Sequence, residues 1–491
     1  MEHTFIARVD QKQPRTTGPC TVSLGRQFTN GEGVWCQWEW GDDGFTLRND
    51  RFGFYPTYYF ATDDCFGVSP SIVNLVRSGA PVEFDDAAMA VFIRLEFFLG
   101  ADTPFRAIRA VSPGCTLRWR NGELSCNAAA VAQNPLGTAR DAAIAEYGQL
   151  FQAAVERQLP EAGERIAVPL SGGRDSRHIL FALAEARCRP ECCLTVKHQP
   201  PKPDEDAVIA AQVCEAVGVP HVVLDRTADL FAAEVEKNLR VGFCTDKHSW
   251  ILPLADHLRS QPVDTIYDGI AGDVLSAGLF LDERRLAMYE GSQLRELAED
   301  LLGDEGYLPK MLPAELYARW NRELAVEHLS AELARHVDTP NPVGQFYFWN
   351  RTRREIALTP WLLLADHCQV LAPYLDHELH DFLAGLPATH FMDHSFHTEA
   401  IQQRYPKLAK LPYETKAAPA TKPAYLDVAR FVRQTARYCM SPGNSLVRRR
   451  FLLPRLLRGL IDPMFGTHIH NICRKPICLI GLSRLVGSLA L

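Results

Sequence analysis

The sequence feature that constrains the fold most is the segment of residues 166–177. A short apolar run from Ile166 to Leu170 leads directly into a Ser-Gly-Gly turn, and apolar residues follow at helical spacing from Ile179 onward. A short apolar run that ends at a glycine turn is typical of a buried parallel strand. The segment therefore predicts a strand, a loop and a helix in that order.

The composition of this loop favours a phosphate ligand. Its two glycines let the backbone approach a ligand closely, while the hydroxyls of Ser171 and Ser176 and the amides at the helix start can donate hydrogen bonds. Asp175 would repel a bare phosphate, so we expect a magnesium ion between the two. The Gly-Lys-Ser/Thr ending of the ATPase P-loop is missing, which argues against simple γ-phosphate hydrolysis. An ordinary Ser-Gly-Gly turn is the alternative interpretation.

Residues 171–176 resemble the signature Ser-Gly-Gly-x-Asp-Ser of the ATP-pyrophosphatase (PP-loop) ligases, which cleave ATP between the α- and β-phosphates. The slot that is usually aliphatic holds Arg174. The resemblance implies that the pyrophosphate portion of ATP is held by Ser171, Gly172, Gly173, Asp175 and Ser176, with Asp175 acting through Mg²⁺.

A second glycine-rich loop follows the apolar run at residues 265–267. It resembles the asparagine synthetase loop Ser-Gly-Glu-Gly-x-Asp-Glu-x-x-Gly-Gly. The resemblance implies that Asp273 is the second magnesium ligand and that Asp268 and Gly269 lie beside the nucleotide. Ile270 stands where that family carries a glutamate near the acceptor, which argues against aspartate as the substrate.

Strands and helices alternate around the first loop. After the strand at 166–170 and the helix from Ser176, we expect a strand at 194–196, a helix over 208–217 and a strand at 221–224. This βαβαβ unit is half of a doubly wound parallel sheet, which binds ligands at the carboxyl ends of its strands. Leu170 and Val196 end two of these strands and are expected to contact the nucleotide. Residues 204–206 are either the family's acidic position or an ordinary acidic helix start.

Residues 1–130 are expected to be mostly β, with strands at 34–40, 45–47 and 55–60 and a hairpin at 116–122. The sequence segments 48–59 and 103–114 resemble the glutaminase-type (Ntn-type) domain of asparagine synthetases. Those glutaminases use a cysteine at position 2, where this chain has Glu2. We therefore expect a degenerate domain that does not hydrolyse glutamine and packs against the next domain, with Cys20 in a structural role.

A lysine is expected near the end of the ligase domain. Residues 411–416 resemble the element in which ligases of this family carry a lysine that meets the charge developing in adenylation or acyl transfer. Lys416 fits this role best, and Lys422 is the alternative.

Residues 282–386 are expected to be helical, with an aromatic stretch at 346–361 in the core. The basic, leucine-rich tail is expected to pack a helix on the domain, and binding to an anionic membrane surface is the alternative.

These segments predict four parts: a degenerate glutaminase-like domain (1–130), a linker (131–140), a ligase domain (141–430) and a basic apolar tail (431–491). A length of 491 residues suits two or three domains. The net charge of −7 gives no sign of the excess of basic residues that nucleic-acid binding usually requires. The 14 cysteines are scattered, no signal peptide or membrane-spanning run is recognised, and we expect a cytoplasmic protein.

The resemblance to asparagine synthetases covers residues 33 to about 425 and implies an ATP-dependent ligase that forms an amide. The expected partners are a small-molecule or peptide carboxylate and an amine donor, with ATP and Mg²⁺ as cofactors, and a homodimer stays open. Two alternatives remain: an intramolecular lactam or macrolactam synthetase, as in the related β-lactam synthetases and lasso-peptide macrolactam cyclases, and a nucleotide-binding relative without activity.

Overall fold

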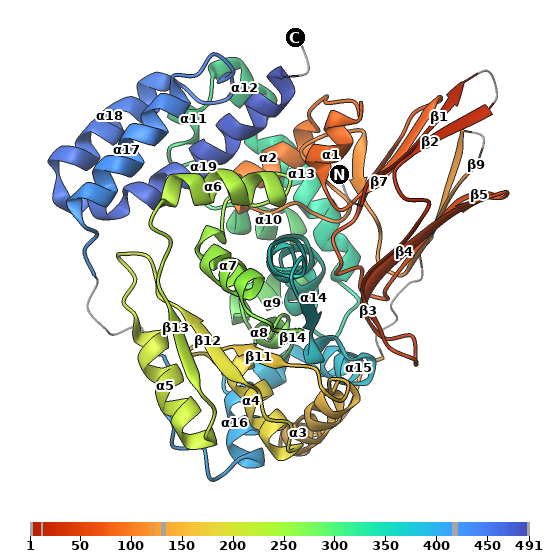
Figure 1. The fold of residues 1–491 in the computed structure, drawn as a ribbon, viewed down its shortest axis with the longest axis vertical. Helices are drawn as coiled ribbons and strands as arrows, with labels where there is room; N and C mark the ends of the chain where they lie inside the picture. Colours follow the sequence, from red (N-terminus) through yellow and green to blue (C-terminus); the bar gives the residue numbers. More distant parts are fainter. Residues whose placement is uncertain (1–2, 11–12, 121, 129–133, 415–420, 489–491) are drawn as a thin grey trace.

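The computed structural model describes residues 3–10, 13–120, 122–128, 134–414 and 421–488. It has two antiparallel sheets in the N-terminal part and one parallel sheet, surrounded by helices, further along the chain. Figure 1 shows the N-terminal strands on one side, the parallel sheet in the lower half and the last helices at the top left. The expected mixed α/β fold is confirmed. Residues 131–133 of the expected linker and Lys416 lie outside the described residues.

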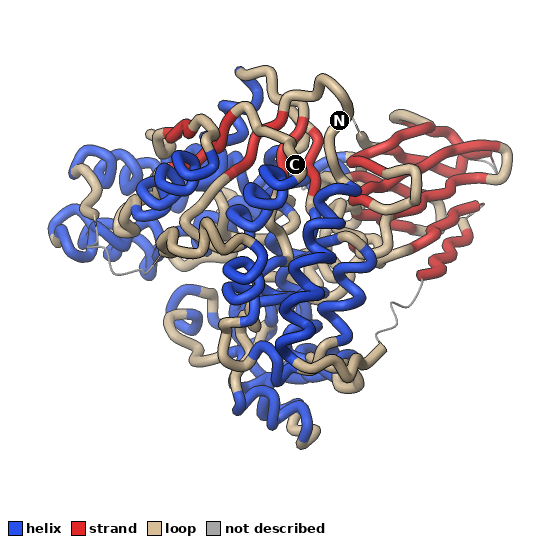
Figure 2. Tube along the Cα trace, turned by 90° about the horizontal axis from the view of Figure 1, so that it is seen from below, coloured by secondary structure: helices blue, strands red, loops and turns tan. Residues whose placement is uncertain are grey.

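The two N-terminal sheets have five strands each and stand together at one edge of the molecule (Figure 2). The first sheet has the order β2-β1-β7-β6-β8 and the second the order β10-β9-β5-β4-β3. Aromatic rings pack between them, with the Phe5 and Phe45 centroids 4.9 Å apart and the Phe66 and Trp119 centroids 5.3 Å apart. The strands are β1 (Phe5–Asp10), β2 (Gln13–Thr17), β3 (Thr21–Gln27), β4 (Gly33–Gly41), β5 (Gly44–Asn49), β6 (Tyr58–Ala61), β7 (Cys65–Ser69), β8 (Ile108–Ala110), β9 (Cys115–Arg120) and β10 (Glu123–Ala128).

The predicted strands at 34–40 and 45–47 and the hairpin at 116–122 are confirmed as β4, β5 and the β9–β10 pair. The strand predicted at 55–60 begins later, at Tyr58. Pro56 has no amide hydrogen to donate, and the preceding loop folds around Asp50, whose carboxylate accepts from the amides of Phe52 and Gly53. Strands β1 to β3 were not predicted.

The parallel sheet has the order β13-β12-β11-β14-β15. Its strands are β11 (Ile166–Pro169), β12 (Cys192–Val196), β13 (His221–Leu224), β14 (Thr265–Tyr267) and β15 (Gln369–Leu371). The βαβαβ prediction is confirmed. The chain order reverses between β11 and β14, and in open α/β sheets such a reversal opens a crevice at the carboxyl ends of the strands.

Helices cover this sheet and form most of the remaining chain, as expected for residues 282–386. They include α1 (Ile72–Arg77), α2 (Asp86–Leu95), α3 (Arg140–Arg157), α4 (Asp175–Glu185), α5 (Glu205–Val217), α6 (Leu230–Arg240), η1 (Ser249–Ile251), α7 (Leu252–Ser260), α8 (Gly272–Ser276), α9 (Glu283–Glu290), α10 (Leu294–Leu302), α11 (Leu308–Met311), α12 (Ala314–Arg319), α13 (Arg322–Leu333), η2 (Ala334–His336), α14 (Pro342–Tyr347), η5 (Pro373–Leu375), α15 (His377–Gly385), η6 (Ala388–Phe391) and α16 (Phe396–Arg404).

Two consecutive segments are π-helices, η3 (Phe348–Ile356) and η4 (Thr359–Leu364). Phe348 and Trp361 are buried in them, so the aromatic stretch belongs to the core as expected. Such helices are rare and often occur at functional sites. Here they carry side chains that line the main cavity.

The basic tail forms helices that pack on the rest of the molecule. They are α17 (Tyr425–Cys439), α18 (Arg449–Ile461) and α19 (Pro463–Gly487). Leu452 and Leu456 are buried, whereas Leu457 is exposed, so one leucine face packs inward. Within the described residues, no helix has the length and apolar character needed to cross a bilayer.

The N-terminal sheets and their connections contact the helical part through polar and aromatic groups. The Phe52 ring lies 4.5 Å from the His380 ring, and the Arg353 guanidinium donates to the carbonyl of Gly100 at 2.6 Å. Nearby, Asp102 accepts from Arg109 and pairs with His328 of α13, with 2.6 Å between Nε2 and Oδ2. The hydrogen bond to Asp102 raises the pKa of His328 above its usual range.

The His328 pair predicts a pH-dependent contact. A histidine whose pKa is raised on folding contributes stability that is present below its ordinary pKa and is lost as the pH rises through the folded value. We expect His328→Gln to lower the free energy of unfolding by about 2 kcal/mol at pH 6 and by less at pH 9. Urea unfolding at both pH values measures this, with the exposed His468→Gln as control. An equal loss at both pH values would contradict a charged pair.

Candidate functional site

One cavity of about 330 Å³ opens at the carboxyl ends of β11, β12 and β14. Both glycine-rich loops reach it. Of the site residues expected from the sequence, those that line it are Leu170, Ser171, Gly173, Asp175, Ser176, Val196, Asp268, Gly269 and Asp273. Gly172 is not among the lining residues and lies against Asp206 instead.

The first loop is held in shape by its own polar groups. The Ser171 amide donates to Ser176 Oγ at 3.2 Å, and the Gly173 amide donates to Ser171 Oγ at 3.1 Å. Helix α4 then begins at Asp175. Its first amides and the two serine hydroxyls therefore lie at the cavity, as an anion site at a helix start requires.

Asp206 fixes the loop from outside. Its Oδ1 accepts from the Gly172 amide at 2.9 Å, and its Oδ2 contacts Nε2 of His198. These interactions, with Lys202 nearby, lower the pKa of Asp206 although burial opposes them. Of the two interpretations of the acids at 204–206, an ordinary helix start does not account for Asp206, because this side chain supports the loop.

The second loop approaches the first through glycines. A Cβ atom on Gly269 would come within 2.7 Å of the Cβ of Asp175, and one on Gly272 within 2.6 Å of its Cγ. Between them Ala271 adopts a φ of 74°, which is unusual for a residue with a side chain. Close approach of the two loops therefore needs glycine at 269 and 272.

This approach places three carboxylates around one cavity. Burial and the neighbouring Asp273 and Asp268 raise the pKa of Asp175 well above its usual range. Burial also raises the pKa of Asp268, to about 6, and that of Asp273. Arg351 of η3 lines the same cavity and acts on Asp273 in the opposite direction. Negative charge is therefore concentrated here and only partly compensated by the protein.

A neutral histidine lies behind Asp175. His397 is fully buried, and its Nε2 is 3.7 Å from Asp175 Oδ1, while its Nδ1 contacts the hydroxyl of Ser276. Burial lowers the pKa of His397 to about 3, so it carries no charge to balance the carboxylate. Within the described part of the chain, no group of three or more His, Cys, Asp or Glu side chains forms a metal site of its own.

The segment before Lys416 is attached to the first loop. The buried Arg177 donates to the carbonyls of Leu411 at 3.2 Å and Pro412 at 2.5 Å and lies over the Tyr413 ring. The Glu414 amide donates to the Gly172 carbonyl. On the other side of residues 415–420, which include Lys416, the Thr421 amide donates to the Pro201 carbonyl at 3.0 Å. The described residues that flank this lysine region therefore lie beside the cavity.

Several lining residues were not identified from the sequence. They are His198, His248, Trp250, Thr352, Ile356 and Thr359. His198 could have been suspected, because it lies between β12 and the acids at 204–206 that the sequence analysis singled out. The others come from η1, the residue before it and the π-helices, which no short motif indicates.

Comparison with known proteins identifies the family to which the chain belongs. A family model described as asparagine synthase matches residues 146–407, which include both glycine loops, the π-helices and α16. A search among curated proteins found no match. Since the family match covers more than half of the 491 residues, the chain belongs to the asparagine synthase family.

Proposed function

We propose that this protein is an ATP-dependent ligase that adenylates a substrate carboxylate, releases pyrophosphate and transfers the acyl group to an amine or ammonia. Membership of the asparagine synthase family indicates amide-bond ligase activity. The observation that carries the proposal is the convergence of the two loops on one cavity at the strand ends. A volume of about 330 Å³ falls within the range of about 300–1,000 Å³ common for small-molecule sites.

In this proposal the apolar strand ends hold the nucleoside. Leu170 and Val196 supply apolar contacts, and Asp268 and Gly269 close the other side. The pyrophosphate portion lies on Ser171, Gly173 and Ser176 at the start of α4. Gly172, also expected there from the sequence, instead donates its amide to Asp206 and helps to hold the loop in shape. On this basis we propose the PP-loop fold for residues 141–430.

The carboxylates fit a divalent cation. Asp175 and Asp273 act as its ligands in this proposal, and burial raises the pKa values of both, although Arg174 and Arg351 compensate part of their charge. Two carboxylates suit Mg²⁺, which takes its other oxygens from phosphate and water. When bound, Mg²⁺ neutralises charge on the phosphates and the departing pyrophosphate.

The substrate carboxylate attacks the α-phosphorus, the bond to the bridging oxygen breaks, and pyrophosphate leaves. The amine then attacks the acyl carbon, and AMP leaves. A lysine beside the cavity would stabilise negative charge in these steps. Lys416 is our first assignment, because the preceding residues 411–414 are tied to the loop. Lys422 is the alternative, and it lines an adjoining cavity.

We further propose that residues 1–130 are a degenerate glutaminase-like domain of Ntn type, joined by a linker at 131–140, and that the tail begins near 431. Glu2 in place of a nucleophilic cysteine supports the loss of glutaminase activity. The contacts of Phe52, Asp102 and Gly100 with the helical part support a packing role. An intramolecular amide synthetase and a nucleotide-binding relative without activity remain as alternatives.

Removal of either metal carboxylate tests the mechanism. We expect Asp175→Asn and Asp273→Asn each to lower pyrophosphate release at least about a hundredfold, because the charge that holds the cation is halved. Coupled-enzyme detection of pyrophosphate measures this, and circular dichroism checks the fold. The exposed Asp141→Asn serves as control. Full turnover in both variants would exclude the metal assignment.

The amine source can be tested with a panel of amines and carboxylates. Stimulation of pyrophosphate release by ammonia would favour an asparagine synthetase-like amidation, whereas release with one amine-bearing carboxylate alone would favour ring closure. Glutamine should yield no glutamate. A steady glutaminase rate would show that the N-terminal part is active, and no release with any substrate would favour the inactive relative.

A further inference from the structure

A second cavity, of about 720 Å³, adjoins the nucleotide cavity. We call it the basic cavity. It shares His198, His248 and Trp250 with the nucleotide cavity, so a ligand in it can reach the nucleotide site. Trp250 is 41% exposed and offers an aromatic surface at this junction. The other lining residues include Lys202, Lys422, His468, His470, Asn471 and Arg474.

Helix α19 forms one wall of the basic cavity. Its lining positions include 464, 467, 468, 471 and 474, which recur at intervals of three and four residues and therefore share one helix face. The opposite side of the helix is buried, and Lys475 donates there to the Ile93 carbonyl at 2.7 Å. The tail thus presents a polar stripe to the cavity from a firmly packed helix.

The charges on the walls are positive. Lys202, Lys422 and Arg474 come from three different segments. Four histidines also line the cavity, and three of them contact carboxylates outside it: His198 with Asp206, His248 with Glu355 and His470 with Glu234. Among the described residues, no Asp or Glu lines this cavity. Lys202 is paired with Asp206 and Glu414. Lys422 and Arg474 have no ion pair within the described part of the chain, although Asp246 lies close enough to interact weakly with Arg474.

Arg474 is the most informative of these groups. Its Nε is buried and has no hydrogen-bond partner. A buried guanidinium nitrogen without a partner is costly, and a carboxylate is the group that best satisfies a guanidinium, through two parallel hydrogen bonds. The Nε atom is shielded from the cavity, so a ligand there would meet the other guanidinium nitrogens of Arg474, which form no ion pair with the described residues.

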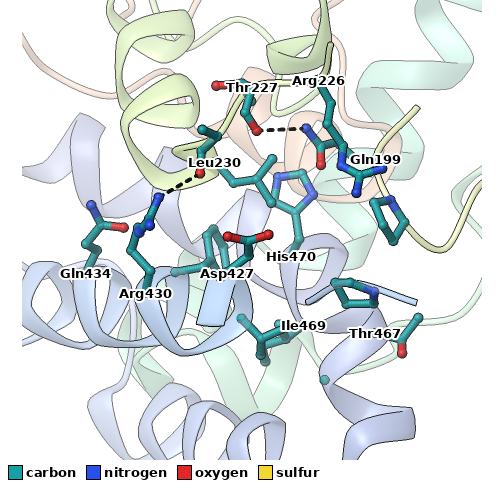
Figure 3. A pocket seen from close by; sticks show the side chains of 16 residues that line it. Gln199, Arg226, Thr227, Leu230, Asp427, Arg430, Gln434, Thr467, Ile469 and His470 are labelled. Carbon is teal, nitrogen blue, oxygen red and sulfur yellow. Dashed lines mark hydrogen bonds between the residues drawn. The ribbon is translucent and has the colours of Figure 1, made fainter. Parts of the chain in front are cut away.

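A smaller pocket of about 40 Å³ continues from the basic cavity between α17, α19 and the loops after β12 and β13. The two share Gln199, Pro200, Thr467 and His470. Figure 3 shows His470 in the middle of this pocket, with Gln199 and Arg226 on one side and Asp427, Arg430 and Gln434 on the other. Polar groups of both donor and acceptor type thus extend the site beyond a single small ligand.

We propose that the basic cavity binds an acidic peptide, one carboxylate of which reacts at the nucleotide site. The proposal rests on the ligase function above. The cationic side chains of the basic cavity lie on three segments of the chain. They therefore suit several negative charges along a peptide better than a single negative charge. A free amino acid would leave most of a 720 Å³ cavity to water.

Binding can be measured without turnover. The probe is a fluorescein-labelled hexaglutamate, compared with labelled hexaserine by fluorescence anisotropy at physiological ionic strength. We expect hexaglutamate to bind at least about tenfold more tightly and Arg474→Gln to remove about tenfold of that affinity. Arg450→Gln, an exposed change of equal charge on α18, should leave it unchanged.

A second variant tests the cavity by filling it with a large side chain. Asn471 is exposed and lines the cavity, so Asn471→Trp should fill it and weaken hexaglutamate binding even if Arg474→Gln fails to fold. Leu457→Trp at an exposed position of α18 is the matched control. Free glutamate should compete only at a large excess.

Three results would overturn the proposal: hexaserine binding as tightly as hexaglutamate, Arg450→Gln weakening binding as much as Arg474→Gln, or glutamate competing as well as hexaglutamate. Binding of a fluorescent ATP analogue to the same samples distinguishes a failure of the peptide-binding proposal from a failure of the proposed ligase function. Loss of peptide binding with intact nucleotide binding contradicts only the basic cavity, whereas absence of nucleotide binding contradicts the ligase.

Discussion

The structure of this site depends on the adjacency of β11 and β14. Because these parallel strands are neighbours, the loops after them must meet at the same edge of the sheet. Gly269 and Gly272 allow a contact in which Asp175 comes against the second loop. The cost is electrostatic, since burial raises the pKa values of Asp175, Asp268 and Asp273, and the two other carboxylates raise that of Asp175 further. This cost is the reason for our proposal that the three carboxylates serve a cation and its phosphate partner.

Other contacts hold this arrangement in place. Asp206 fixes the backbone at Gly172 from the next βα unit, and Arg177 attaches the chain at 411–413 to the start of α4. The π-helix η3 brings Arg351 to the cavity and, through Arg353, contacts Gly100 of the N-terminal part. The N-terminal part thus contacts a helix that lines the site, which is consistent with a packing role for this part.

The sequence was informative where function depends on short, contiguous patterns. Residues 166–177 and 265–278 each combine a strand with a glycine loop, so their strands and their place at the sheet edge could be predicted. Strand β1 was missed in part because one of its partners lies far along the chain, with Phe66 opposite Ala7. Strands β2 and β3 pair with their chain neighbours β1 and β4, and nothing in the structure explains why they were missed. The acids at 204–206 were singled out, but the hydrogen bond from the Gly172 amide to Asp206 and the basic cavity could not be predicted, since each depends on residues that only the fold brings together. No short motif indicates the π-helices. Arg474 and His198 are 276 residues apart in the chain and line one cavity.

The central claim is that the two loops bind the pyrophosphate portion of ATP together with magnesium. Titration calorimetry with inorganic pyrophosphate tests it most directly, because no acceptor or amine has to be known. The account predicts binding at a single site in the presence of Mg²⁺ and its loss in excess EDTA. Equal binding with and without Mg²⁺, or no binding at all, would contradict the account.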